Sequence, residues 1–402
     1  MSSGSPKSPP DVPPLPAVDG APAKVGAAGA PAKAQAAVAS DAAPGAGHEA
    51  LQPGDVLDGR YVLQDPIGEG GVGLIFRAIQ FKVQRPVAVK FLQRDMVGEH
   101  SLKPRFEREA LTLAALAHPN IVRLQDYGIA RGNPFLVMEF IEGRTLRGLL
   151  NDEGGFLPVP RALGLTRQML YALAYAHERG IVHRDLKPAN LIVQNLPQQP
   201  EHLKVLDFGF AKFLPGSELD LGAQLTRAGH TFGSPPYMSP EHATGSPVDG
   251  RSDLYSVGIL LFEMLTGARP FEGEIHELLR HHLVTPAPRL AERRPELSSH
   301  VELQRMLDRA LAKRRDERFA DAGEFLAAIE AVEAAANAEA AQVTLAREPQ
   351  LSGEVRFADV ARVSAGFANA QLRRFQREGL PKLIAWGNAL LRHVRKQLKR
   401  KR

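Results

Sequence analysis

Two short polar segments constrain this chain more than any other feature. The first reads HRDLKPAN at residues 183–190, and the second reads DFG at residues 207–209. The first sets Asp185, a carboxylate able to accept a hydroxyl proton, beside a lysine and an amide ligand for a cation, and the second adds an aspartate that can hold a metal. Phosphoryl transfer needs an aligned nucleophile and cations against the phosphate oxygens more than it needs covalent chemistry from the protein. The two segments therefore predict a site for phosphoryl transfer.

A glycine-rich segment lies upstream of both. Residues 67–75 place Gly68, Gly70 and Gly73 at the spacing GxGxxG. The spacing alone is weak evidence, because dinucleotide-binding folds use it between a strand and a helix. The residues after Gly73 instead alternate as in a second strand. We therefore expect a hairpin whose glycines let backbone amides approach phosphate groups.

Three further segments extend the pattern. Residues 87–90 (VAVK) form a β-rich run that ends in a cation, and residues 134–143 are typical of a buried strand that leads into a linker. Residues 103–116 have helical periodicity, with one apolar face made of Phe106, Ala110, Leu113 and Ala114. In their order and spacing these motifs resemble those of protein kinases. The pair Asp185 and Lys187 resembles the serine/threonine form of the catalytic loop, and the chain is similar to eukaryotic-like (Hanks-type) bacterial kinases.

The resemblance implies a role for each polar residue of the site. Asp185 orients the attacking hydroxyl and accepts its proton, while Lys187 steadies the transferred phosphoryl group. Asn190 and Asp207 hold Mg²⁺, or Mn²⁺, both of which prefer oxygen ligands. Further contacts with ATP are implied for Ile67, Gly68, Gly70, Gly73, Ile75, Ala88, Lys90, Met138, Glu139, Ile141 and Asn190.

The resemblance also implies a helix acid that pairs with Lys90. Glu107 and Glu109 point to different sides of the expected helix, and the family pattern F-x-R-E-A, present at residues 106–110, selects Glu109. Glu107 is then expected to be a solvated surface acid. Met138 takes the gatekeeper position, with backbone groups of Glu139 and Ile141 facing adenine.

The segment between Asp207 and Glu241 resembles an activation segment. A phosphate on Thr226 or Thr231 would add about two negative charges and could pair with Arg184, which makes autophosphorylation a natural expectation; the alternative is that both are plain loop hydroxyls. Two residues depart from the commonest pattern, because Ser234 replaces a threonine and Ser239 an alanine. Ser234 keeps a hydroxyl that would reach toward the catalytic loop.

Two residues outside the site resemble structural positions of the family. Asp253 is expected to tie a helix to the catalytic-loop backbone and to cap that helix as well. Arg318 is expected to pair with Glu241. The fold class implied is α+β, with a small antiparallel β-rich lobe and a larger helical lobe.

The domain limits follow from motifs and composition. Residues 1–55, rich in alanine and proline, are expected to form a disordered extension. The kinase domain is assigned to residues 56–335, with lobes at about 61–138 and 142–332. A linker at 336–353 leads to a basic tail at 354–402, and residues 327–341 are expected to be helical.

The tail carries the basic charge of the chain. Residues 354–402 hold thirteen Lys or Arg and three Asp or Glu, a net +10 in a chain of net +5. Around Trp386, apolar and basic residues of 379–402 separate onto opposite helix faces. This pattern suits an anionic membrane surface or a protein partner, and also a solvated tail. A single aromatic residue argues against nucleic-acid binding.

Composition adds the cellular setting. The chain has no cysteine, which excludes disulfides and favours a reducing compartment. No uninterrupted run of 18 apolar residues occurs and no signal-peptide pattern is present, so we expect a cytoplasmic protein, peripheral at the inner face of the membrane if the tail binds lipid. A homodimer is compatible with the sequence. Two alternatives stay open, a pseudokinase scaffold and a small-molecule phosphotransferase, although the peptide-docking pattern SPE at 239–241 argues against the second.

Overall fold

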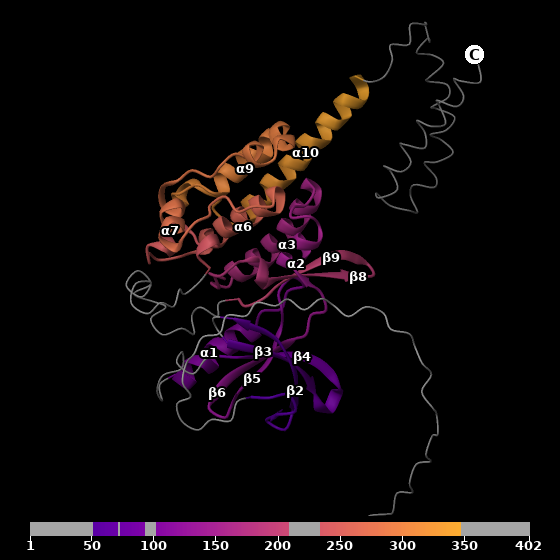
Figure 1. Ribbon diagram of the computed structural model, residues 1–402, viewed down its shortest axis with the longest axis vertical. Coiled ribbons are helices and arrows are strands. Elements are labelled where there is room, and N and C mark those ends of the chain that lie inside the picture. The colour runs from indigo at the N-terminus through magenta and orange to yellow at the C-terminus, as the bar shows by residue number, and fades with distance from the viewer. Residues whose placement is uncertain (1–50, 71–72, 93–101, 209–233, 347–402) are drawn as a thin grey trace, which may run out of the picture. The chain divides into compact units, whose positions relative to one another are not determined.

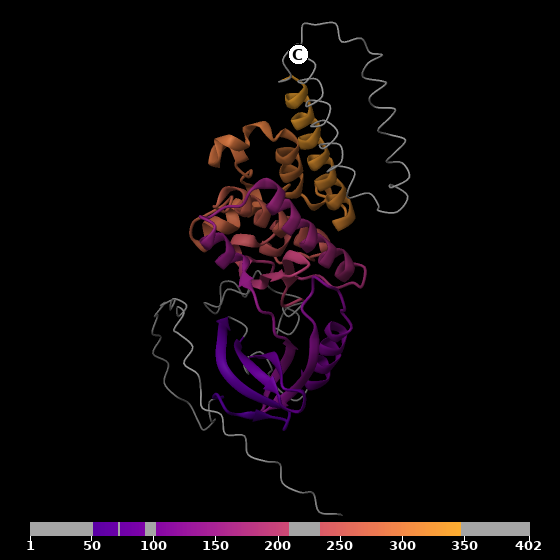
Figure 2. The same cartoon turned by 90° about the vertical axis from the view of Figure 1, so that its right-hand side faces the viewer.

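The computed structural model describes residues 51–70, 73–92, 102–208 and 234–346. Within this part of the chain, a six-stranded antiparallel sheet with one helix forms a first lobe, and a second lobe is mainly helical (Figures 1 and 2). The arrangement confirms the expected α+β class with a small β-rich lobe and a larger helical lobe. Residues 1–50 of the extension assigned to 1–55 lie outside the described residues, as does the basic tail.

The six-stranded sheet has the order β1-β2-β3-β4-β6-β5. Its buried face holds Phe76, Val89, Phe91 and Phe135, because successive side chains of a strand point to opposite faces. The alternation along β4 therefore turns Ala88 and Lys90 to the other face, toward the second lobe. The strands are β1 (Val56–Leu57), β2 (Tyr61–Gly70), β3 (Gly73–Gln80), β4 (Arg85–Phe91), β5 (Leu124–Ala130) and β6 (Asn133–Glu139).

Helix α1 (Leu102–Ala114) corresponds to the helix expected at 103–116. Phe106, Ala110 and Leu113 are buried as expected, and the ring of Phe106 lies edge-on to Tyr127 of β5 with 5.9 Å between ring centroids. Ala114 is exposed, so its assignment to the buried face was wrong. It is the last residue of α1.

The helical lobe is built around α6 (Gly250–Thr266). Every residue from Ser252 to Leu265 is buried, as expected for a helix that is apolar on all sides and enclosed by others. Helices α3 (Val159–His177) and α9 (Val301–Ala310) pack against it. The remaining helices are α2 (Leu146–Asp152), α5 (Pro240–Ala243), α7 (Ile275–Val284), α8 (Leu290–Arg293) and α10 (Ala322–Ala346).

A three-stranded sheet completes the helical lobe next to the first lobe. It has the order β7-β8-β9, with β7 at Arg144–Thr145, β8 at Leu191–Leu196 and β9 at Gln199–Val205. β9 leads directly into the DFG segment. Short 3₁₀ helices occupy Phe81–Val83 (η1), Pro188–Asn190 (η3), Pro235–Tyr237 (η5), Pro295–Ser299 (η6) and Arg315–Glu317 (η7).

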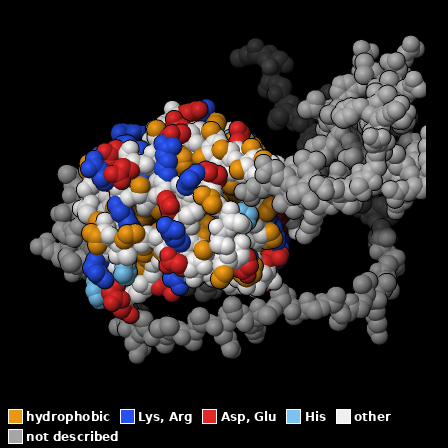
Figure 3. Space-filling model, turned by 90° about the horizontal axis from the view of Figure 1, so that it is seen from above, with side chains coloured by type: hydrophobic (Ala, Val, Ile, Leu, Met, Phe, Trp, Pro, Cys, Tyr) orange, Lys and Arg blue, Asp and Glu red, His pale blue; other side chains and the backbone are white. Residues whose placement is uncertain are grey.

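Helix α10 is longer than the helix expected at 327–341 and extends into the stretch assigned as linker. An ion pair of 2.5 Å between Arg167 of α3 and Glu333 joins α10 to the body of the lobe. Acidic and basic side chains are interspersed over the end of the helical lobe seen in Figure 3. Among the described helices, none combines the length and the apolar character that a membrane span requires.

Candidate active site

The catalytic segment 183–190 connects α3 to β8, and α6 holds its backbone in place. One carboxylate oxygen of Asp253 accepts the backbone N–H of His183 (2.8 Å) and lies 2.7 Å from His177 Nε2, and the other accepts the N–H of Arg184 (2.9 Å). Burial alone would raise the pKa of Asp253, but these contacts, led by the hydrogen bond with His177, lower it below the ordinary value. The expectation that Asp253 ties α6 to the catalytic loop is confirmed.

Asp253 does not cap its helix. The N-cap of α6 is Asp249, whose side chain accepts the backbone N–H of Arg251 at 2.9 Å. The expectation that Asp253 has both roles was therefore wrong, because it lies in the first turn, where it faces the catalytic loop. Gly250 separates the two, and a Cβ there would meet His177 Nδ1 at 2.6 Å, so glycine makes room for the histidine that supports Asp253.

The side-chain contacts of the catalytic loop leave one carboxylate oxygen of Asp185 available as a hydrogen-bond acceptor. Lys187 Nζ lies 2.8 Å from Asp185 Oδ2, and Asn190 Nδ2 donates to the Asp185 carbonyl oxygen at 2.8 Å. Asp185 Oδ1 is buried and has no hydrogen-bond partner among the described residues. Because the amide nitrogen of Asn190 is engaged, its amide oxygen is the atom left to act as a ligand. The loop thus presents two oxygen atoms with the chemistry of an acceptor and a cation ligand.

Lys90 and Asp207 meet across the two lobes. Lys90 of β4 is 4% exposed, and its Nζ lies 2.7 Å from Asp207 Oδ2, which follows β9. Both residues were predicted to lie in the site, but their direct contact was not predicted. Glu109 is half-buried on α1, and its pairing with Lys90 stays a prediction.

Two residues of the site have strained backbones. Arg184 and Asp207 have φ of 70° and 58°, in the left-handed region that residues other than glycine seldom adopt. Such conformations cost about 1–3 kcal/mol each and persist where surrounding contacts hold them. At Arg184 the contact is the backbone N–H bond to Asp253, and at Asp207 it is the contact of the carboxylate with Lys90.

The glycine segment forms the hairpin expected from the sequence. β2 and β3 pair antiparallel with Gly70 opposite Gly73, so a strand leads into a strand and the dinucleotide-binding alternative does not apply. Gly73 has φ of 145°, and a Cβ there would lie 1.7 Å from the carbonyl oxygen of Phe91. Only glycine fits this position, which brings the hairpin against the end of β4 close to Lys90.

Strand pairing gathers several expected ATP contacts on one face of the sheet. Ile75 lies opposite Lys90 in the β3–β4 pair, and Ala88 lies opposite Met138 in the β4–β6 pair. Residues opposite each other share a face, and so do residues two apart in one strand. Ile75, Ala88, Lys90 and Met138 therefore share one face. Ile67 is half exposed near the end of β2, with Gly68 next to it, and Ile141 follows the end of β6.

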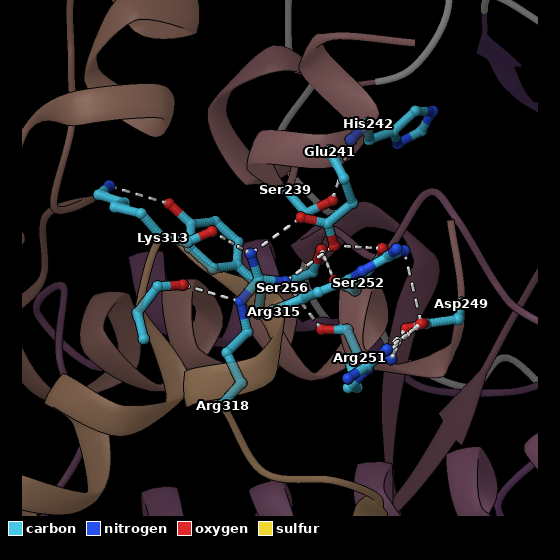
Figure 4. A network of polar contacts seen from close by, with 12 residues as sticks. Ser239, Glu241, His242, Asp249, Arg251, Ser252, Ser256, Lys313, Arg315 and Arg318 are labelled. Carbon is cyan, nitrogen blue, oxygen red and sulfur yellow. Dashed lines mark hydrogen bonds and ion pairs between the residues drawn. The ribbon is translucent and has the colours of Figure 1, made fainter. Parts of the chain in front are cut away.

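The last part of the expected activation segment, around Ser239 and Glu241, is held by a buried network (Figure 4). Arg318 donates to both carboxylate oxygens of Glu241 at 2.8 Å, which confirms their expected pairing, and Ser252 donates to the same carboxylate. Ser239 accepts the backbone N–H of His242 at 3.3 Å and so caps α5. Thr226 and Thr231 lie outside the described residues.

Ser234 shares a pocket with residues of the catalytic loop. It lines one small pocket together with Arg184, Asp185, Leu186, Tyr237, Met238, His242 and Ser256. Burial, followed by the nearby charge of Arg184, lowers the pKa of His242, which lines the same pocket. Ser234 and Asp185 line the same pocket, and a reach of the Ser234 hydroxyl toward the catalytic loop stays a prediction.

Sequence reasoning missed several residues that position the site. Tyr237 donates to Glu263 of α6 at 2.8 Å and accepts from Arg147 of α2 at 2.7 Å. These bonds fix the last part of the expected activation segment to both helices. His177 and Lys204 were missed as well. Their partners are 26 to 90 positions away in sequence, so local periodicity carries no signal for them.

Comparison with known proteins agrees with this geometry. The model of the protein kinase domain matches residues 61–331. The chain is 39% identical to serine/threonine-protein kinase pkn3 of Myxococcus xanthus over 70% of this chain and 51% of that protein. It is 38% identical to PknB of Mycolicibacterium smegmatis over 67% of this chain and 42% of that protein. The chain thus matches about half the length of these relatives, or less.

Solved structures give the same result. The kinase domain of PknI from M. tuberculosis superposes with a TM-score of 0.55 at 28% identity, covering 71% of this chain and 100% of that domain. The β-rich lobe and the helical lobe thus have the fold of that kinase domain. The chain therefore belongs to the protein kinase family, among relatives named as bacterial serine/threonine-protein kinases.

Proposed function

We propose that this protein transfers the γ-phosphoryl group of ATP to serine or threonine hydroxyls of other proteins. The observation that carries the proposal is the geometry of Asp185. One of its carboxylate oxygens is engaged by Lys187, and the other is buried with no hydrogen-bond partner among the described residues. A carboxylate in this state can accept a hydrogen bond from an incoming hydroxyl and orient its oxygen for attack.

The other residues supply position and charge. Lys90 would contact the α- and β-phosphates, and Lys187 the group in transfer, so that positive charge lies on both sides of the breaking bond. The shared face of Ile75, Ala88 and Met138 is apolar and would receive the adenine ring. Backbone groups of Glu139 and Ile141 would complete this contact.

The residues present fit a magnesium ion that is held jointly with ATP. Within the described residues, no group of three or more His, Cys, Asp or Glu could hold a metal ion. Asn190 and Asp207 offer two oxygen ligands, which suits Mg²⁺ because it commonly takes one or two protein ligands and completes its shell with phosphate and water. When bound, the ion would neutralise charge on the phosphate oxygens.

Autophosphorylation is the regulation we propose, with Thr226 or Thr231 as acceptor. Its support is Arg184, which lines the pocket beside Ser234 and holds a strained backbone next to the proposed base. A phosphate near Arg184 would gain a charge-assisted pair with its guanidinium.

Two substitutions separate binding from transfer. Asp185→Asn should lower kcat by about 10²- to 10⁴-fold and leave the affinity for Mg-ATP nearly unchanged, because the residue acts on the acceptor hydroxyl. Asp207→Asn should weaken the magnesium-dependent part of ATP binding and also abolish transfer. Calorimetry with ATP, and incorporation of labelled phosphate into a basic protein substrate, measure the two effects.

The matched control is Asp152→Asn at the end of α2, where the side chain is 57% exposed, and it should change neither quantity. Turnover retained by Asp185→Asn would remove Asp185 from the proposed role. A wild-type protein that binds Mg-ATP and transfers nothing would support the scaffold alternative instead. Transfer to sugars, choline or aminoglycosides in preference to peptides would support the small-molecule phosphotransferase.

A further inference from the structure

A part-buried ion pair joins the strand before the DFG segment to the end of β6. Lys204 of β9 lies with its Nζ 2.8 Å from Glu139 Oε1 and 3.4 Å from the carbonyl oxygen of Ile121. The side chains of Lys204 and Glu139 are 13% and 28% exposed. Both charges are thus largely withdrawn from water, and each has the other as its counter-ion.

Glu139 is also bound to the residue that precedes β5. Its Oε1 accepts the backbone N–H of Arg123 at 2.9 Å, and its own backbone N–H donates to the Arg123 carbonyl oxygen at 3.0 Å. Side chain and main chain of Glu139 are therefore both held by the backbone of Arg123. Lys204, on β9 of the helical lobe, contacts the same Glu139 carboxylate.

β9 is hydrogen-bonded to the residues that precede Arg123. The backbone N–H of Val205 donates to the Asn120 carbonyl at 2.8 Å, and the Val205 carbonyl accepts from Val122 at 2.9 Å. Asn120 Nδ2 donates to the carbonyl oxygen of Leu203 at 2.8 Å. Lys204 thus extends from a strand that is hydrogen-bonded to Asn120 and Val122. Three residues further along the chain, Asp207 contacts Lys90.

We propose that Lys204 is a positioning residue for the adenine end of ATP. The ion pair fixes the peptide unit of Glu139, next to Met138, relative to the strand that ends at Asp207. The adenine-binding backbone and the phosphate-side aspartate are then held at a constant separation. Without Lys204 the half-buried Glu139 carboxylate loses its counter-ion and turns toward solvent, which releases the end of β6. This inference rests on the proposed ATP site.

The test is Lys204→Gln, which keeps the length of a polar side chain and removes the charge. We expect KM for ATP to rise about 3- to 10-fold, in line with a part-buried charged hydrogen bond, and kcat to change by less than about 2-fold. Calorimetry should show the same loss for adenosine, whereas the affinity for tripolyphosphate with magnesium should not change. A purely structural defect would weaken both ligands.

Three further variants test whether Lys204 and Glu139 act as a pair. Lys204→Arg should restore the wild-type KM, Glu139→Gln should raise it as Lys204→Gln does, and the double variant should add little to either single change. Lys82→Gln, on the exposed turn η1, is the matched lysine control and should behave as the wild type. The Arg and Glu139 variants test the proposal even where Lys204→Gln fails to fold.

An unchanged KM in both Lys204→Gln and Glu139→Gln would overturn the proposal, as would equal weakening of adenosine and tripolyphosphate. These results, with a wild type that binds ATP, would leave the proposed function intact. A wild type that binds neither ATP nor adenosine would contradict the proposed function and this inference together.

Discussion

Glu241 and Arg318 meet inside the helical lobe, where the Arg318 side chain is fully shielded and that of Glu241 is 9% exposed. Burial alone would raise the pKa of Glu241, but the hydrogen bonds from Arg318 and Ser252 lower it below its ordinary value. Arg318 also donates to the backbone carbonyls of Ala312 and Lys313. The pair therefore joins the last part of the expected activation segment to the connection between α9 and α10.

Removing one member of this pair should lower the stability of the folded protein. Glu241→Gln leaves the Arg318 guanidinium buried without a counter-charge, and we expect it to lower the free energy of unfolding by about 3 kcal/mol. Urea unfolding followed by circular dichroism measures the change. Glu302→Gln breaks an exposed pair with Arg305 and should have little effect. Equal effects of the two substitutions would contradict the account of this ion pair.

The same residue predicts a dependence on pH. The pKa of Glu241 in the folded protein is lower than its unfolded value, near 4.5. Its contribution to stability is therefore fully present above about pH 4.5 and is lost as the pH falls through the folded pKa. Glu241→Gln should accordingly show a shallower loss of stability than the wild type in that acid range. Parallel stability curves below pH 4.5 would contradict this assignment.

At the scale of elements, the helix α5 is capped by the side chain of Ser239. Ser239 departs from the commonest family residue, and its hydroxyl accepts the His242 backbone N–H. Ser239→Ala should lower the free energy of unfolding by about 0.5–1 kcal/mol, at the weaker end for an N-cap because the contact is long. Ser239→Asp should recover the loss. No change in urea midpoint for the alanine variant would mean that the cap contributes nothing.

The sequence predicted those elements whose signal is local. The hairpin at 67–75 followed from strand alternation after Gly73, and α1 followed from its apolar face. The contacts of Lys204 with Glu139 and of Lys90 with Asp207 join positions 65 and 117 residues apart, so no periodicity reports them. Asp249 was missed as the cap of α6 because Asp253, four residues later, offers the same residue type at a helix start.

At the scale of the whole molecule, charge is divided between the catalytic body and the basic tail. Residues 354–402 carry a net +10, which leaves the remainder of the chain at −5. The described body shows mixed charges on the face in Figure 3, and the tail lies outside the described residues. We propose that residues 379–402 act separately from the catalytic site, on an anionic membrane surface or a protein partner.

Deletion of residues 379–402 tests that separation. Phosphorylation of a soluble peptide should stay unchanged, and flotation with vesicles containing anionic lipid should be lost, because basic residues near such a surface contribute about 1 kcal/mol each. Raising the salt concentration should weaken flotation of the full chain in the same way. Identical partitioning of both forms would argue against the membrane surface and for a protein partner or a solvated tail.

The most direct measurement is mass spectrometry of a serine- and threonine-containing peptide library after incubation with the purified full chain, ATP and magnesium. The account predicts one phosphate group on serine or threonine for each ATP converted to ADP, and none in the Asp185→Asn variant. Unmodified peptides and intact ATP, with magnesium or manganese present, would contradict it.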